Sequence, residues 1–151
     1  GEICLQAPNL MRCYHREDNH PSFREGWFYS GDLARQDAEG WYEVVGRSKD
    51  MIISGGENIS LSAVERALHS HFPHKAFAAF SMNDDRWGDS LHIAIAGDGF
   101  PNENDVREYL SQHFGPSGSV KGFLHLPELP LIGIGKVDRR KLVEIAMEAP
   151  N

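Results

Sequence analysis

The sequence predicts an α+β fold, with a sheet of three or more strands, helices on one side of it, and a short β-rich segment before it. From Met51 onward the apolar pattern gives the order strand, helix, strand, strand, helix, strand, loop, helix. Before Lys49 the chain is too short and too β-rich to bury a core of its own. We therefore expect residues 1–48 to be the remnant of a larger domain and residues 49–151 to be a small domain.

The β-rich part is expected to consist of strands joined by turns. Residues 1–7 alternate weakly, as a strand does, and start in the middle of that pattern without an initiating Met, so we expect a fragment of a longer protein. The aromatic run Trp27-Phe28-Tyr29 predicts a strand that ends at the Ser30-Gly31-Asp32 turn. Residues 41–45 predict the return strand of a hairpin.

The small domain is predicted to begin with a strand, a glycine turn and a helix. Met51-Ile52-Ile53 is a short apolar strand, and the two glycines Gly55-Gly56 allow the backbone to turn after it. Ser60 or Ser62 is placed to cap the helix, and Glu65 follows Ser62 with the spacing of a capping box.

Three further strands and two helices complete the expected domain. The strands lie at residues 75–82, 90–96 and 120–126. Asn102 precedes apolar residues at helical spacing and is placed to cap one helix. Asp138 is placed to cap the last helix, which is expected to run to about Met147.

Composition excludes some classes of function. The net charge of −7 argues against a general nucleic-acid binder, which would need a basic face. No apolar run approaches the ~20 residues of a membrane span. Cys4 and Cys13 fit no metal spacing, and a disulfide between them is one alternative. Two lone cysteines in an acidic chain more often indicate a reducing compartment such as the cytoplasm.

Two polar residues near strand ends are candidates for nucleotide binding. The carboxylate of Asp32 can accept two hydrogen bonds from a ribose diol, although a Gly-Asp turn is also a common structural feature. Arg47 supplies planar donors suited to phosphate or sugar oxygens, and its alternative role is a surface salt bridge.

Two glycine-containing segments are candidates for ligand contact. Gly55 and Gly56 can let a ligand chain pass close to the backbone, although they lack the Gly-Lys-Ser/Thr ending of a P-loop and can equally form a plain turn. Lys136 ends the small loop Gly133-Ile134-Gly135 and can stabilise negative charge on a phosphate or carboxylate oxygen. Its alternative is a solvated lysine before a helix.

Three histidines close together in the sequence are a candidate metal site. His69, His71 and His74 have a conceivable spacing, but they span a helix end and Pro73 without a nearby cysteine or carboxylate pair. We expect a solvated helix terminus there and predict no metal site.

Three motifs together resemble one family. They are GWFYSGDL, then DAEGWYEVVGRSKDMIISGGENISLSAVE, then PLIGIGKVDRRKL. Their order and spacing resemble the carboxy-terminal part of the adenylate-forming enzymes, which include acyl- and aryl-CoA synthetases, the adenylation domains of peptide synthetases and firefly luciferases. The resemblance covers essentially the whole chain. The ISGGEN stretch is more similar to CoA ligases than to the adenylation domains of peptide synthetases.

The resemblance implies roles for individual residues. It implies that Asp32 binds both ribose hydroxyls of the adenylate and that Arg47 contacts the ribose and phosphate region. Gly55 and Gly56 resemble the loop beside which the pantetheine arm of CoA passes. Lys136 resembles the lysine that touches the carboxylate and the α-phosphate during adenylation.

The same resemblance implies a two-step reaction with a hinge. A carboxylate and ATP give an acyl-adenylate and pyrophosphate, then CoA gives the thioester, and the small domain rotates about Lys49 between the steps. Two positions depart from the family pattern, because Ser30 and Ile132 stand where many relatives have Thr. Ile132 leaves the lysine loop more apolar.

The implied ligands are a small carboxylic acid, ATP and CoA, with Mg²⁺ bound by residues outside this segment. The implied partner is the missing amino-terminal domain, which would hold the phosphate loop and the acid pocket, so we expect the fragment alone to be inactive. The sequence does not identify the acid or the oligomeric state. The alternatives are an adenylation domain that loads a carrier protein and a non-catalytic module that binds a nucleotide or a partner.

Overall fold

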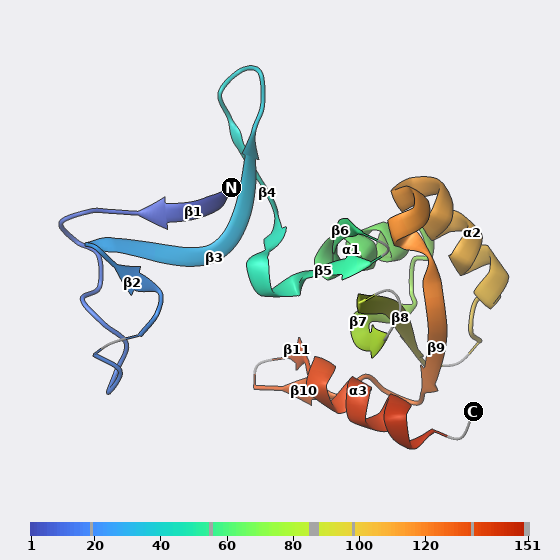
Figure 1. The fold of residues 1–151 in the computed structure, drawn as a ribbon. Coiled ribbons are helices and arrows are strands. Elements are labelled where there is room, and N and C mark those ends of the chain that lie inside the picture. The colour runs from blue at the N-terminus through green and yellow to red at the C-terminus, as the bar shows by residue number, and fades with distance from the viewer. Residues whose placement is uncertain (19, 55, 85–87, 98, 134, 150–151) are drawn as a thin grey trace. The chain divides into compact units, whose positions relative to one another are not determined.

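The computed structural model describes residues 1–18, 20–54, 56–84, 88–97, 99–133 and 135–149. The chain divides into two compact units, Gly1–Asp50 and Met51–Asn151 (Figure 1). Both units contain sheet, and the second also carries the α-helices, so the predicted α+β class is confirmed.

The first unit is a four-stranded antiparallel sheet built around one long strand. The long strand is β3 (Trp27–Gln36), and it pairs with β1 (Glu2–Leu5), β2 (Phe23–Arg24) and β4 (Tyr42–Arg47). A short 3-10 turn, η1 (Ser48–Asp50), ends the unit. The predicted hairpin with a return strand is therefore confirmed.

Strand β3 does not end at Gly31, so the predicted turn at Ser30-Gly31-Asp32 is wrong. Gly31 has a φ of +77°, which favours glycine, and the pairing register with β4 shifts between Leu33 and Ala34. The Gly31 N–H donates to Oε1 of Glu2 on the neighbouring strand at 2.9 Å. The glycine therefore marks an irregularity inside the strand, and β3 continues beyond it.

The second unit contains a five-stranded sheet with the order β6-β5-β8-β7 and with β9 beside β8. Its strands are β5 (Met51–Ser54), β6 (Glu57–Ser60), β7 (Ala76–Asp84), β8 (Gly88–Ala96) and β9 (Val120–Leu126). The β8–β9 pair is parallel and the other pairs are antiparallel.

Helices cover both faces of this sheet, which corrects the expectation of helices on one side. Helices α1 (Leu61–His71) and α2 (Glu103–Phe114) pack on one face, and α3 (Arg139–Glu148) packs on the other (Figure 1). The reason lies in β7 and β8, whose continuous apolar runs are buried on both sides rather than alternating with polar residues.

The two faces carry two separate apolar clusters. The cluster under α1 and α2 includes Val64, Leu68, Leu91, Ile93, Ile95, Val106 and Leu110. The cluster under α3 consists of Ala78, Phe80, Ala94, Leu124 and Leu142, with smaller contributions from partly buried side chains. Alternate residues of β8 thus belong to different clusters, as the side-chain period of a strand requires.

The cap of α1 is Ser60, whose Oγ accepts the Ala63 N–H at 3.3 Å. The alternative of a capping box between Ser62 and Glu65 is wrong, because Glu65 points to the sheet and pairs with Arg139 instead. The caps predicted for the other two helices are confirmed: Asn102 accepts an N–H at 2.8 Å and Asp138 accepts one at 3.1 Å.

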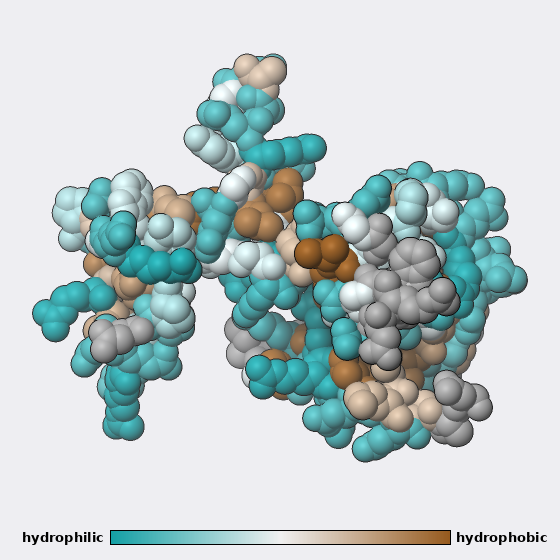
Figure 2. Space-filling model, in the orientation of Figure 1, coloured by the Kyte–Doolittle hydropathy of each residue, from teal (hydrophilic) through white to brown (hydrophobic). Residues whose placement is uncertain are grey.

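Several short elements were not predicted, among them β2 (Phe23–Arg24), η1 (Ser48–Asp50) and the strand β6 (Glu57–Ser60) that stands between the glycine turn and α1. A 3-10 turn, η2 (Gly115–Gly118), joins α2 to β9. A small antiparallel hairpin of β10 (Leu131–Ile132) and β11 (Lys136–Val137) precedes α3. The visible surface is mostly hydrophilic (Figure 2), and no helix among the described residues has the length and apolar character to cross a membrane.

The packing of α3 can be tested through one side chain. Leu142 is fully buried in the α3 cluster, so Leu142→Ala should lower the free energy of unfolding of the second unit by about 2–5 kcal/mol. Met147 lies on the same helix and is 73% exposed, so Met147→Ala should change it by less than about 0.5 kcal/mol. Chemical denaturation followed by circular dichroism measures both, and equal effects would contradict the assigned packing of α3.

Candidate functional site

Asp32 and Arg47 face each other across β3 and β4 of the first unit. They are directly paired in the antiparallel register, and Arg47 Nε donates to Asp32 Oδ1 at 2.8 Å. The Arg47 side chain is 46% exposed and the Asp32 side chain 31% exposed, so both charges remain open to solvent. The structure thus brings together the two residues that the sequence suggested for nucleotide binding.

The backbone next to this pair is held in place locally. The Asp32 N–H donates to Ser30 Oγ at 3.0 Å. The carboxylate offers acceptors to a diol, while the guanidinium offers a planar set of donors to phosphate or sugar oxygens. The donor and acceptor set therefore fits the ribose and phosphate of a nucleotide.

Lys49 lies in the η1 turn, at the end of the first unit. Its side chain is exposed, and it is separated by Asp50 from the first residue of the second unit. A short, solvent-facing turn is the kind of segment that can absorb backbone rotation. A hinge at Lys49 remains a prediction.

The glycine turn lies at one end of the second sheet. Ser54 pairs with Glu57, so Gly56 lies in a short connection between β5 and β6. Gly56 has a φ of +85°, and a Cβ built on it would meet nothing within 4 Å. Glycine is therefore favoured there because of the positive φ, and not because neighbouring atoms leave no room for a Cβ. Gly55 lies outside the described residues.

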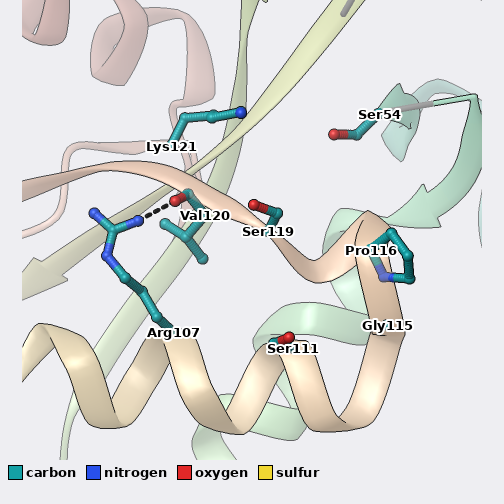
Figure 3. Close-up of a pocket in the computed structure, with 8 residues that line it drawn as sticks. All are labelled: Ser54, Arg107, Ser111, Gly115, Pro116, Ser119, Val120 and Lys121. Carbon is teal, nitrogen blue, oxygen red and sulfur yellow. Dashed lines mark hydrogen bonds between the residues drawn. The ribbon is translucent and has the colours of Figure 1, made fainter.

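A cavity of about 540 Å³ lies next to this turn, between the end of β5 and the α2 side of the sheet (Figure 3). Ser54 lines one side, and the other side is formed by Arg107, Ser111, Gly115, Pro116, Ser119, Val120 and Lys121. The Arg107 guanidinium donates to the Val120 carbonyl and lies 4.8 Å from the centre of the Phe123 ring. These contacts hold one positive charge at the cavity wall.

The sequence did not point to Arg107 or Lys121. They lie on a helix and on a strand and come together only through the packing of α2 against β9. Isolated basic residues without a motif resemble ordinary surface residues, so only their shared cavity distinguishes them.

Lys136 lies in β11 and pairs with Ile132 across the β10–β11 hairpin. Its side chain is exposed, and within the part of the chain that the structure describes it makes no ion pair. The base of the hairpin is closed where the Asp138 N–H donates to the Pro130 carbonyl at 2.8 Å. Ile134 lies outside the described residues.

The Lys136 hairpin and the cavity belong to opposite faces of one sheet. Val137 and Leu129 pack against the apolar cluster under α3. The cavity lies on the α2 side, with Arg107 and Val120 at its wall. The second unit therefore carries two candidate contact surfaces on opposite sides of its sheet.

No three His, Cys, Asp or Glu side chains gather as a metal-binding group in the described ranges. Two of the histidines considered for a metal site make ring contacts instead. His69 lies edge-on to Phe77 with ring centres 5.8 Å apart, and His71 stacks on Tyr109 at 4.1 Å.

His92 is a half-buried titratable group at the centre of the sheet. Ser90 Oγ donates its proton to the Met82 carbonyl at 2.8 Å, so it must accept from His92 Nε2, which lies 3.1 Å away. A Cβ on Gly122 would lie only 2.7 Å from His92 Nδ1, so this side of the ring is tightly packed. Burial, and secondly the charge of Arg107, lower the pKa of His92 from its ordinary value of 6.5.

The lowered pKa of His92 predicts that the free energy of unfolding depends on pH. The folded state binds a proton at His92 less readily than the unfolded state, so the free energy of unfolding should fall as pH decreases below about 6.5. His92→Gln keeps a donor for Ser90 and should remove this part of the pH dependence. His74→Asn, at an exposed position of the same unit, should retain it. Denaturation curves between pH 5 and 8 compare the two, and an unchanged slope in His92→Gln would contradict the assignment.

Comparison with known proteins finds relatives of this chain but no matching family model. It is 36% identical over 150 residues to the peroxisomal trans-cinnamate:CoA ligase of Petunia hybrida, covering 97% of this chain and 26% of that protein. It is also 36% identical over 141 residues to feruloyl-CoA synthase of an Amycolatopsis species, covering 91% and 29%. The chain thus spans less than a third of the length of these relatives.

Solved structures agree with this relationship. The o-succinylbenzoate CoA synthetase of Bacillus subtilis, in complex with its acyl-adenylate intermediate, matches with a TM-score of 0.81 and 32% identity, covering 94% of this chain and 30% of that one. An amide bond synthetase of Marinactinospora thermotolerans matches with a TM-score of 0.82 at 24% identity, which supports the fold alone.

The fold and the sequence comparisons together define the class. The resemblance to adenylate-forming enzymes is confirmed, and the chain is related to the CoA ligases of that superfamily over a segment of about 26–30% of their length.

Proposed function

We propose that this chain is the carboxy-terminal part of an ATP-dependent acyl- or aryl-CoA ligase. The observation that carries the proposal is the placement of Lys136 and of the Gly56 turn with its cavity on different sides of one sheet. A ligase of this kind runs two different half-reactions, and each surface suits one of them. The similarity to CoA ligases supports the choice of reaction.

In the first half-reaction a carboxylate oxygen attacks the α-phosphorus of ATP, the bond to the β-phosphate oxygen breaks, and pyrophosphate leaves. Negative charge gathers on the carboxylate and phosphate oxygens, and the ammonium group of Lys136 would offset it. The exposed position of Lys136 in a short hairpin suits this approach. Asp32 and Arg47 would hold the ribose and phosphate.

In the second half-reaction the sulfur of CoA attacks the acyl carbonyl carbon and AMP leaves. The Gly56 turn has open space where a side chain would stand, so a narrow pantetheine chain could pass close to the backbone. Arg107 and Lys121 in the adjoining cavity place positive charge near the path of a phosphate-bearing thiol.

The two surfaces cannot meet the same reacting atoms in one orientation of the second unit. A rotation at Lys49 between the steps would present first Lys136 and then the Gly56 turn. Each orientation would stabilise one transition state, which is differential binding achieved with two arrangements of one unit.

The remaining partners follow from this reading. The acid pocket, the Mg²⁺ ligands and the phosphate loop are assigned to the part of the ligase that precedes this chain. The acid is a small aryl or acyl carboxylate, in keeping with the reported relatives. Cys4 and Cys13 are both free thiols, which supports a reducing compartment such as the cytoplasm.

The proposal is tested by separating the two half-reactions in the intact ligase. Lys136→Ala should slow acyl-adenylate formation by about 10²-fold or more, because a charge that stabilises the transition state is removed. It should leave thioester formation from supplied acyl-adenylate unchanged. Pyrophosphate release measures the first step and thioester formation measures the second.

Lys141→Ala is the matched control, because Lys141 is an exposed lysine five positions further along that pairs with Glu144 on α3. It should leave both steps unchanged. Equal loss of both steps in Lys136→Ala would overturn the assignment. Offering a carrier protein in place of CoA distinguishes the alternative acceptor.

A further inference from the structure

Glu65 of α1 and Arg139 of α3 form a two-pronged ion pair between segments 74 positions apart in the chain. Arg139 Nη2 lies 2.9 Å from Glu65 Oε1 and 3.0 Å from Oε2. The side chain of Arg139 is 28% exposed and that of Glu65 19%. This pair is therefore far less open to water than the pair of Lys141 (52%) and Glu144 (60%) on α3.

Both side chains also bind the backbone of Ala79, in the middle of β7. The Ala79 N–H donates to Glu65 Oε1 at 2.9 Å, and Arg139 Nε donates to the Ala79 carbonyl at 2.9 Å. Strand β7 is an edge strand, since it pairs with β8 alone among the described strands. The pair therefore satisfies the outward-facing polar groups of Ala79 in place of a further strand.

This arrangement fixes the point where the lysine hairpin joins the core. Arg139 is the first residue of α3 and follows Lys136 by three positions. Of the two residues between them, Val137 packs on the α3 cluster and Asp138 bonds to the Pro130 carbonyl. On the other side of Lys136 stands Gly135 with a φ of +94°, which adds no side-chain anchor. The position of Lys136 thus depends on the anchor that follows it.

The geometry points to Glu65 and Arg139 as positioning residues for Lys136, acting through the edge of β7 and the start of α3. This inference rests on the proposed function, because it assigns the pair a purpose in the adenylation step. Neither side chain needs to contact a reactant. The pair holds the strand that carries Lys136 at a fixed place on the α3 face of the sheet.

The structural half of the inference is tested on this chain by amide hydrogen exchange. Glu65→Gln keeps the shape and an acceptor for Ala79 but removes the charge, and Arg139→Lys keeps the charge but cannot bond Glu65 and Ala79 in the same way. Both should speed exchange at Ile132, Lys136 and Val137 by about tenfold, the scale of one lost hydrogen bond to a charged group. Glu144→Gln, which breaks the exposed pair on α3, should leave exchange unchanged. Unchanged hairpin exchange in Glu65→Gln and Arg139→Lys would overturn the inference.

The functional half is tested in the intact ligase with the half-reactions measured separately. Arg139→Lys should slow adenylation by about tenfold and leave thioester formation from supplied acyl-adenylate unchanged. Added to Lys136→Ala, it should cause no further loss, because a positioning residue has no effect once the group it positions is gone.

Additive losses in that double variant, or equal slowing of both half-reactions, would show that the pair only stabilises the fold and would overturn the inference. Failure of the unaltered protein to form an acyl-adenylate would instead overturn the proposed function. The exchange comparison on this chain would then still show whether the pair holds the hairpin, so the two failures are distinguishable.

Discussion

Burial of both faces of strand β8 is the constraint on which the second unit depends. Leu91, Ile93 and Ile95 face the α1–α2 cluster, while Ala94 faces the cluster under α3. A strand buried on both sides needs a covering layer on each, so the last helix must cross to the face that α1 and α2 leave open. The chain segment that leads into α3 is the one that carries Lys136. The position of this lysine is therefore a consequence of how the sheet is covered.

The same constraint gives the unit two different surfaces. A cavity with Arg107 and Lys121 lies beside the Gly56 turn on one side, and a single exposed lysine stands on a hairpin on the other. Neither surface contains a complete catalytic group, and the Asp32–Arg47 pair belongs to the other unit. A unit with two such surfaces is suited to serve two consecutive reactions by turning. In the proposed ligase the sheet separates the surface used for adenylation from the surface used for thioester formation.

Much of this could be predicted from the sequence, for physical reasons that differ by element. The caps Asn102 and Asp138 and the strands around β7 and β8 have strong local signals. The hairpin of β3 and β4 was predicted too, but not the register that pairs Asp32 with Arg47, because the strand was expected to end at the Gly31 turn. The second face of the sheet was missed because a continuous apolar run does not reveal what covers it. Glu65 was assigned to a capping box from its spacing, whereas a partner 74 positions away decides its role. The cavity residues likewise have no local signature.

The most direct test of the account is a distance measurement between the two units of the intact ligase. Spin labels at Glu39 and Arg140, both exposed, would report the separation by pulsed electron resonance with an acyl-adenylate analogue alone and then with CoA added. Rotation about Lys49 predicts two distinct distance distributions. It also predicts that Lys49→Pro, which restricts φ at the hinge, retains only the distribution seen before CoA is added. One distribution shared by both states of the unaltered protein would contradict the rotation, and with it the assignment of the two surfaces to two half-reactions.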